Sequence, residues 1–253
     1  MDKKLEKAMS KLGLLGKDIS YSFSRTYFTS KFKNEHLPFN YENFDIEDIS
    51  EFPSVLKSNP NLVGLNVTIP YKEAIIPYLD AISDQVREIG AVNTITFSKD
   101  GKLKGYNTDC YGFENSIKPY IKPHHKKALI LGTGGASKAI AYTLKQLGIE
   151  FHHVSRAKNA KATFTYDDLT EAIIGTHTLI INCTPVGTHP KVNDCPDIPY
   201  DGITKAHLLY DLIYNPQQTK FLTCGEILGA TTANGLEMLE LQAEKAWQIW
   251  NLA

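Results

Sequence analysis

The sequence has few cysteines, and it has no long apolar run. Four of its 253 residues are cysteines, and none forms a C-x-x-C pair, so the spacing excludes a zinc knuckle and favours reduced, mostly structural thiols. The eight histidines are equally scattered, and we expect no metal site. No apolar run approaches the roughly 20 residues that a bilayer span requires, and residues 1–10 do not lead into the apolar core of a secretory signal. We therefore expect a cytoplasmic protein.

The sequence also lacks an excess of charge of either sign. Lysine and arginine total 27 and aspartate and glutamate total 28, which gives a formal net charge of -1. Bulk electrostatics therefore provides no drive toward nucleic acid or a membrane surface. Hydrophobic residues make 42% of the chain and charged residues 22%, values that argue against a disordered or coiled-coil protein. The length allows one large domain or two compact ones.

Both halves of the chain alternate between strand and helix character. In the first half, LGLLG, YENFDI and LVGLNVTIP predict strands with helical segments between them, and AVNTITFSKDGKLKGYNT predicts a hairpin around Asp100-Gly101. Residues 126–156 predict a strand, a glycine-rich turn, a helix and a second strand, and TLIIN, HLLYDL and ATTAN follow as short strands. The second half is thus predicted to be a parallel, doubly wound sheet. Residues 235–252 predict an amphipathic helix with Gln242 on or beside its apolar stripe.

The glycine-rich turn GTGGAS, residues 132–137, follows a predicted strand and opens a predicted helix. Glycines there allow a tight turn and let backbone N–H groups approach a pyrophosphate at the positive helix N-terminus. We therefore predict a dinucleotide site that includes Gly132, Gly134, Gly135 and Ala136. The alternative is a tight turn without a ligand.

The second strand of this unit ends in Ser155-Arg156, with Lys158 and Lys161 just beyond. Folds that bind NAD place an acidic residue in this region, where it accepts hydrogen bonds from the adenosine ribose. A guanidinium suits a 2′-phosphate instead, and a carboxylate would repel one. We therefore predict NADP(H) as the cofactor, bound here by Ser155, Arg156 and Lys158; a solvated basic loop is the alternative.

Five polar segments carry the candidate chemistry: SFS (22–24), NVTIPYK (66–72), AVNT (91–94), NTD (107–109) and Gln242. Taken singly, they suit caps, turns or a surface lysine. Reducing a polyhydroxylated acid with a nicotinamide requires donors for a carboxylate, polar groups for hydroxyls and one proton-transfer group. Residues able to supply this set are Ser22, Ser24, Asn93, Asp109 and Lys72.

At this point the sequence resembles the shikimate dehydrogenases. The resemblance rests on seven motifs in order, namely ISYSFS (19–24), NVTIPYK (66–72), GAVNT (90–94), GYNTD (105–109), GTGGAS (132–137), YDLIY (210–214) and NGL with Met238-Leu239 and Gln242 (234–242). It implies NADPH-dependent reduction of 3-dehydroshikimate to shikimate, in the pathway to chorismate and the aromatic amino acids. It also implies a substrate-binding and catalytic α/β domain of residues 1–108 plus 235–253, with the terminal helix returning to it, and a Rossmann domain of residues 109–234.

The resemblance also implies roles for single residues. Ser22 and Ser24 would hold the substrate carboxylate, and its hydroxyls would be held by Thr68, Asn93, Asp109 and Gln242. Tyr214 would lie near the same pocket. Lys72 and Asp109 would form the catalytic pair, with Lys72 passing a proton to the carbonyl oxygen as hydride arrives. A lysine close to a carboxylate stays protonated, which agrees with that role.

Some residues depart from the family pattern. Arg25 stands where a proline commonly follows the second serine, and a second arginine is missing after Arg156, so that Lys158 and Lys161 are the candidates to replace it. The Y-x-x-x-K spacing of Tyr27 and Lys31 matches short-chain reductases but precedes the glycine-rich turn, and we interpret it as two faces of one helix.

Two other functions remain as alternatives. One is a quinate/shikimate dehydrogenase that uses NAD, which Arg156 opposes. The other is a dinucleotide-binding regulator without catalysis, which Lys72 and Asp109 oppose. The expected partner is a small-molecule substrate, and the expected assembly is a monomer or homodimer.

Overall fold

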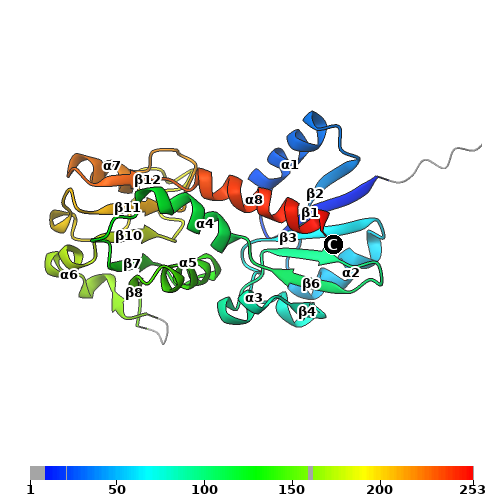
Figure 1. Cartoon of the computed structure of the whole chain (residues 1–253), viewed down its shortest axis with the longest axis horizontal. Coiled ribbons are helices and arrows are strands. Elements are labelled where there is room, and N and C mark those ends of the chain that lie inside the picture. Colours follow the sequence, from blue (N-terminus) through cyan, green and yellow to red (C-terminus); the bar gives the residue numbers. More distant parts are fainter. Residues whose placement is uncertain (1–8, 21, 159–161, 253) are drawn as a thin grey trace, which may run out of the picture. The chain divides into compact units, whose positions relative to one another are not determined.

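The computed structural model describes residues 9–20, 22–158 and 162–252 (Figure 1). The chain divides into two compact units, a first unit of Met1–Thr108 with Lys245–Ala253 and a second unit of Asp109–Glu244. The terminal helix α8 (Leu236–Asn251) is thus shared between them. The division falls at Lys245 rather than before the helix at Gly235, because the first half of α8 packs on α4 within the second unit.

A six-stranded mixed sheet forms the centre of the first unit. Its strands are, in spatial order, β2 (Phe39–Asp45), β1 (Ser10–Gly16), β3 (Leu62–Val67), β5 (Thr94–Phe97), β6 (Leu103–Tyr106) and β4 (Ala81–Ile82). β1 pairs in parallel with both β2 and β3, which confirms the alternating strand and helix pattern. β5 and β6 form the predicted antiparallel hairpin, and Gly101 in its turn takes the left-handed φ of 80° that favours glycine.

The helices of the first unit pack on this sheet together with the end of α8. They are α1 (Phe23–Asn34), α2 (Phe52–Ser58) and α3 (Asp84–Ile89), with 3₁₀ turns at Ile49–Glu51 and Ile76–Tyr78. Tyr27 and Lys31 both lie on α1, as expected for residues of one helix. Trp250 of α8 donates from Nε1 to the Ile95 carbonyl at 3.0 Å and packs against Phe28. The terminal helix therefore returns to the first unit.

The second unit contains a six-stranded sheet in which every pair is parallel. Its strands are, in spatial order, β12 (Thr231–Ala233), β11 (Leu208–Asp211), β10 (Leu179–Asn182), β7 (Lys127–Leu131), β8 (Glu150–Ser155) and β9 (Phe164–Thr165). The predicted doubly wound sheet is confirmed. Strands buried on both faces account for the continuous apolar runs in this half of the sequence.

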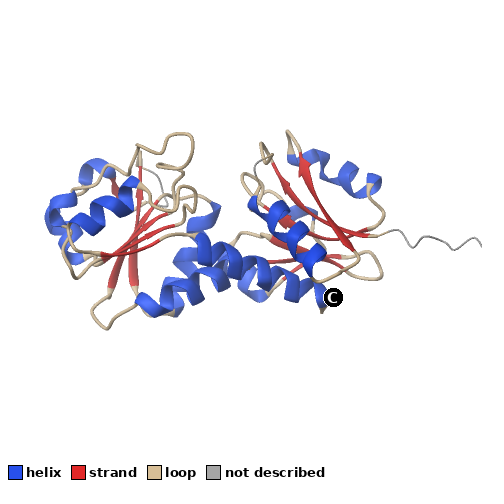
Figure 2. Ribbon diagram, turned by 90° about the horizontal axis from the view of Figure 1, so that it is seen from above, coloured by secondary structure: helices blue, strands red, loops and turns tan. Residues whose placement is uncertain are grey.

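Helices cover both faces of the second sheet (Figure 2). One face packs on α4 (Asp109–Ile117), α5 (Gly135–Gln146) and the start of α8, and the other packs on α6 (Glu171–Thr176) and α7 (Lys220–Ile227). Short 3₁₀ turns lie at Lys118–Tyr120, Tyr166–Asp168 and Tyr200–Gly202. Successive strand residues point to opposite faces, so Ile130 belongs to the first of these cores and Leu129 and Leu131 to the second.

The helices, the metal-ligating side chains and the cysteines of the described residues bear on whether this is a membrane, metal-binding or disulfide-linked protein. Within the described part of the chain, no helix combines the length and the apolar character needed to cross a membrane. The same residues contain no group of three or more His, Cys, Asp or Glu side chains arranged to hold a metal ion. The four cysteines are free thiols.

Candidate active site and cofactor site

The two serines predicted to hold a carboxylate lie at the start of α1. Ser22 is the N-cap residue, and its hydroxyl accepts a hydrogen bond from the Arg25 N–H at 3.4 Å. A proline has no N–H, so the arginine at this position supplies a capping donor that the family's usual proline lacks. Ser24, in the first turn, shares a hydrogen bond with the Tyr41 hydroxyl. Both serines are half-buried.

A chain of buried hydrogen bonds continues from Tyr41 across the sheet. The Tyr41 hydroxyl donates to Asn66 Oδ1 at 2.7 Å, and Asn66 Nδ2 lies 3.2 Å from both the Asn93 carbonyl and Thr94 Oγ1. Asn93 Nδ2 donates to Thr108 Oγ1 at 3.0 Å, and its Oδ1 accepts the Thr108 N–H at 2.7 Å. Burial raises the pKa of Tyr41 well above its usual value, so its hydroxyl stays a donor.

We call these six residues, with Ser24 at one end, the polar network: Ser24, Tyr41, Asn66, Asn93, Thr94 and Thr108. Asn66 and Thr108 lie within the sequence motifs, but we predicted no role for either. Tyr41 lies outside the motifs, and we predicted no role for it. Asn66 is 4% exposed in a strand that is otherwise apolar, and a buried amide of this kind is the signal that could have identified it. The network holds Asn93 in a single orientation, as a substrate-binding amide requires.

Thr68 and Lys72 lie beside this network, after the end of β3. The Thr68 N–H donates to the Leu15 carbonyl at 2.9 Å, and the Lys72 carbonyl accepts the Val92 N–H at 2.7 Å, next to Asn93. Both side chains are half-buried. The first unit therefore brings together the predicted residues Ser22, Ser24, Thr68, Lys72 and Asn93.

The remaining predicted substrate residues, Asp109, Tyr214 and Gln242, belong to the second unit. Asp109 begins α4, and one turn later a Cβ on Gly112 would lie 2.5 Å from the Met238 carbonyl and 3.1 Å from Gln242 Cβ. Only a glycine permits this close approach of α4 and α8. It places Gln242, which we expected in the first domain, beside the helix that starts at Asp109.

Tyr214 follows the end of β11, where α8 also begins. The N–H of Gly235 donates to the Ile213 carbonyl at 3.1 Å. The nearby Asp211 is fully buried and accepts from Asn182 Nδ2, Thr219 Oγ1 and the Ile213 N–H at 3.0, 2.7 and 3.0 Å. Burial raises the pKa of this carboxyl to about 6, although those three hydrogen bonds oppose the change. Asp211, which the sequence analysis left without a role, fixes the segment that carries Tyr214.

The glycine-rich turn lies between β7 and α5, as predicted. Gly132 has a φ of 109° and a Cβ there would lie 3.2 Å from Thr184 Cγ2, so the position requires glycine. Gly134 is the N-cap residue of α5, is exposed, and has open space where a Cβ would lie. Gly135 and Ala136 follow in the first turn. This turn fits a dinucleotide, because glycines leave the backbone N–H groups of the helix start accessible to a pyrophosphate.

The basic residues predicted to select NADP lie at the end of β8. Ser155 is buried and donates its hydroxyl to the Ala157 carbonyl, while Arg156 and Lys158 are exposed. Burial raises the pKa of Tyr166 to about 12, and the positive charge of Arg156 opposes that rise. Two exposed cations in one short segment fit a 2′-phosphate. Lys161, the other basic candidate, lies outside the described residues.

Known proteins resemble this chain, one family in its first half and others over nearly its whole length. Residues 14–95 match the family described as the shikimate dehydrogenase substrate binding domain. The chain is 39% identical to the shikimate dehydrogenase (NADP(+)) of Methanosphaera stadtmanae, over 94% of this chain and 90% of that protein.

Solved structures extend the likeness to the whole fold. Shikimate dehydrogenase 1 from Peptoclostridium difficile is 38% identical, with a TM-score of 0.81 over 97% of this chain and 92% of that one. The Thermus thermophilus shikimate 5-dehydrogenase in complex with NADP(H) and shikimate is 29% identical, with a TM-score of 0.85 over 97% and 94%. Since sequence and fold both agree over nearly the full length, the chain belongs to the shikimate dehydrogenase family.

Proposed function

We propose that this chain catalyses the reversible, NADPH-dependent reduction of 3-dehydroshikimate to shikimate, in the pathway to chorismate and the aromatic amino acids. The observation that carries the proposal is the grouping of Lys72 and Thr68 beside Asn93 in the first unit, in a chain of this family. These are a proton donor and two hydroxyl-binding groups. A small polyhydroxylated acid needs all of them.

The substrate side of the reaction is assigned to eight side chains. Ser22 and Ser24 bind the carboxylate, Thr68, Asn93, Asp109 and Gln242 bind the hydroxyls, and Tyr214 lies near the same substrate. Lys72 donates a proton to the carbonyl oxygen and takes it back in the reverse direction. Asp109 is the proposed partner of Lys72 in the catalytic pair.

The cofactor is assigned to the second unit. NADPH, when bound, supplies the hydride. The turn at Gly132, Gly134, Gly135 and Ala136 binds the pyrophosphate, and Ser155, Arg156 and Lys158 bind the 2′-phosphate. We therefore assign residues 1–108 and 235–253 to the substrate-binding domain and residues 109–234 to the cofactor-binding domain, from which Asp109 and Tyr214 also serve the substrate. The cytoplasmic location and the monomeric or homodimeric state stay predictions.

The test uses purified protein with shikimate and either NADP or NAD, while the absorbance of reduced nicotinamide is followed. Fast, shikimate-dependent reduction of NADP is the expected result. Preference for NAD, or equal activity with quinate, would instead assign the chain to the quinate/shikimate dehydrogenases that use NAD. Binding of NADPH without any turnover would favour a regulator and overturn the roles of Lys72 and Asp109.

A further inference from the structure

His153, on β8, is hydrogen-bonded to the glycine-rich turn that follows the neighbouring strand β7. Its Nδ1 lies 3.1 Å from the carbonyl oxygen of Gly132. A carbonyl oxygen can only accept, so the ring donates through Nδ1–H. The N–H of Gly132 in turn donates to the Val154 carbonyl at 2.8 Å. His153 and Val154, which are adjacent on β8, thus form hydrogen bonds with the carbonyl and the N–H of Gly132.

The direction of the Gly132 carbonyl matters for the amides of the turn. In a trans peptide the N–H points opposite to the C=O of the same peptide group, and the cis peptides of the described chain all precede prolines elsewhere. Fixing the Gly132 carbonyl toward His153 therefore fixes the direction of the Thr133 N–H. A pyrophosphate binds such a turn most tightly when its N–H groups are already oriented before binding.

The surroundings of His153 favour the neutral imidazole, which donates through Nδ1–H. Its ring is half-buried and meets the Phe151 ring edge to face, with centroids 5.7 Å apart, on the sheet face covered by α5. Burial lowers the pKa of His153, although the bond to Gly132 opposes this, and the imidazole is neutral at neutral pH. Protonation at Nε2 would leave Nδ1–H in place, so the hydrogen bond does not depend on the charge of the ring.

We propose that His153 is a positioning residue of the cofactor site, which orients the Gly132–Thr133 peptide for the pyrophosphate of NADPH. It acts through Gly132 rather than by touching the cofactor. The inference rests on the proposed function, since it takes the turn as the pyrophosphate site. The glycine pattern alone does not identify His153, because the residue lies on a different strand from the turn.

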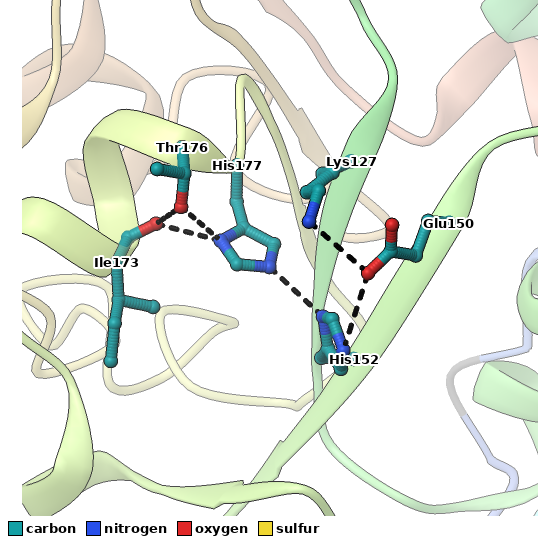
Figure 3. A network of polar contacts seen from close by, with 6 residues as sticks. All are labelled: Lys127, Glu150, His152, Ile173, Thr176 and His177. Carbon is teal, nitrogen blue, oxygen red and sulfur yellow. Dashed lines mark hydrogen bonds and ion pairs between the residues drawn. The ribbon is translucent and has the colours of Figure 1, made fainter.

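The preceding residue, His152, provides a matched control. Its side chain points to the opposite face of the sheet, where its Nδ1 lies 2.9 Å from His177 Nε2 and its Nε2 lies 3.7 Å from Glu150 Oε1 (Figure 3). It shares the strand, the residue type and partial burial with His153, but it does not contact the turn. Any general effect of removing a histidine from β8 should appear at both positions.

The experiment compares His153→Val, His153→Asn and His152→Val in the full-length protein. The Kd for NADPH is measured by titrating nicotinamide fluorescence, and kcat and the KM for shikimate are measured at saturating NADPH. His153→Val should raise the Kd roughly threefold to tenfold, the equivalent of one net hydrogen bond, and leave the KM for shikimate unchanged. His153→Asn should recover most of the affinity, because its Nδ2 donates from a position close to that of the histidine Nδ1. His152→Val should keep the wild-type Kd.

Thermal unfolding of each variant shows whether it is folded. Where His153→Val does not fold, His153→Phe keeps the ring and its contact with Phe151 but lacks the donor, and it takes the same role. A wild-type Kd in the donor-free variants, or an equal rise in Kd in His152→Val, would overturn the positioning role. Wild-type protein that does not bind NADPH at all would instead overturn the proposed function.

Discussion

The two units bury polar side chains of different chemistry. In the first unit, the polar network consists of hydroxyls and amides, and burial moves the pKa of Tyr41 still further above neutrality. In the second unit, buried histidines stand just before strands of the sheet, with His125 before β7, His177 before β10 and His207 before β11. Histidine is the side chain whose ordinary pKa places its change of charge between about pH 5 and 8. Acid should therefore act on the second unit and spare the network that supports the candidate active site.

The hydrogen bonds of the second unit require neutral rings. His125 Nδ1 accepts the Lys122 N–H at 3.0 Å. His177 donates from Nδ1 to the Ile173 carbonyl at 2.7 Å, so its Nε2 accepts from His152 (Figure 3). Burial lowers the pKa of both His125 and His177. A second proton on either ring would remove an acceptor, and no such change is available to the amides and hydroxyls of the first unit.

The largest effect is expected at Lys72, the proposed proton donor in the first unit. Lys72→Ala should lower kcat by about two to four powers of ten with a smaller change in the KM for shikimate, because the general acid is lost. Steady-state kinetics of shikimate oxidation measures both quantities. Lys57→Ala, which removes an exposed lysine from α2, should retain wild-type kcat. A change in KM alone would assign Lys72 to substrate binding.

The next effect is expected at the cofactor end of the second unit. Arg156→Ala should weaken NADPH by about tenfold to a hundredfold, the range for a lost charge-assisted hydrogen bond. NADH, which has no 2′-phosphate, should be affected far less. Separate titrations with the two nucleotides provide the comparison within one protein. Equal losses for both would contradict a contact between Arg156 and the 2′-phosphate.

Breaking the polar network should have a moderate effect on the stability of the first unit. Tyr41→Phe removes the donor to Asn66 Oδ1 and leaves that buried oxygen unsatisfied, at a cost of about 1–2 kcal/mol. Urea unfolding followed by tryptophan fluorescence measures it, since both tryptophans, Trp247 and Trp250, belong to the first unit. The loss should be equal at about pH 7.5 and about pH 5.5, because histidine does not take part in the network. If the loss of stability depended on pH, the buried network of the first unit would be acid-sensitive too, and the contrast between the two units would fail.

The sequence was enough to propose candidate site residues at strand ends, but it did not predict the contacts that orient them. Lys72, Asn93 and Gly132 lie in short motifs whose residue types follow from the reaction and from turn geometry. Tyr41 contacts Asn66 from β2, two strands away across β1, and His153 contacts Gly132 from β8, the strand beside β7. Which residues face each other depends on strand register, such as Ile130 opposite His153. Periodicity within one segment contains no information on that register.

The close approach at Gly112 was unpredictable for a related reason. From sequence alone, a glycine inside a helix indicates only that the helix is less stable. Here Gly112 lets α4 contact α8, which lies more than a hundred residues further along the chain. The second unit therefore extends to Glu244 and includes the first half of α8, whereas we expected the second domain to end before Gly235. Local patterns therefore predicted an α/β fold for both units. They did not predict that the terminal helix would be divided between the units at Lys245.

The smallest effect is the one that tests the pH contrast directly. The pKa of His177 in the folded chain is lower than its unfolded value of about 6.5. Its stabilising contribution is therefore fully present above about pH 6.5 and is lost as the pH falls through the folded-state pKa. Lys127 and His152 disfavour the extra proton and Glu150 favours it, so solvent and opposing charges keep the effect modest.

Hydrogen exchange, corrected at each pH with an unfolded reference, resolves the two units. Between about pH 7.5 and about pH 5.5, β7 and β10, which follow His125 and His177, should lose protection while β1 and β3 keep theirs. His177→Phe, which cannot be protonated, should flatten the dependence in β10, and His189→Gln, at an exposed position in the same unit, should leave it as in the wild type. Equal loss of protection in both sheets would mean that acid acts on the whole chain, and that the histidines before the strands do not distinguish the second unit.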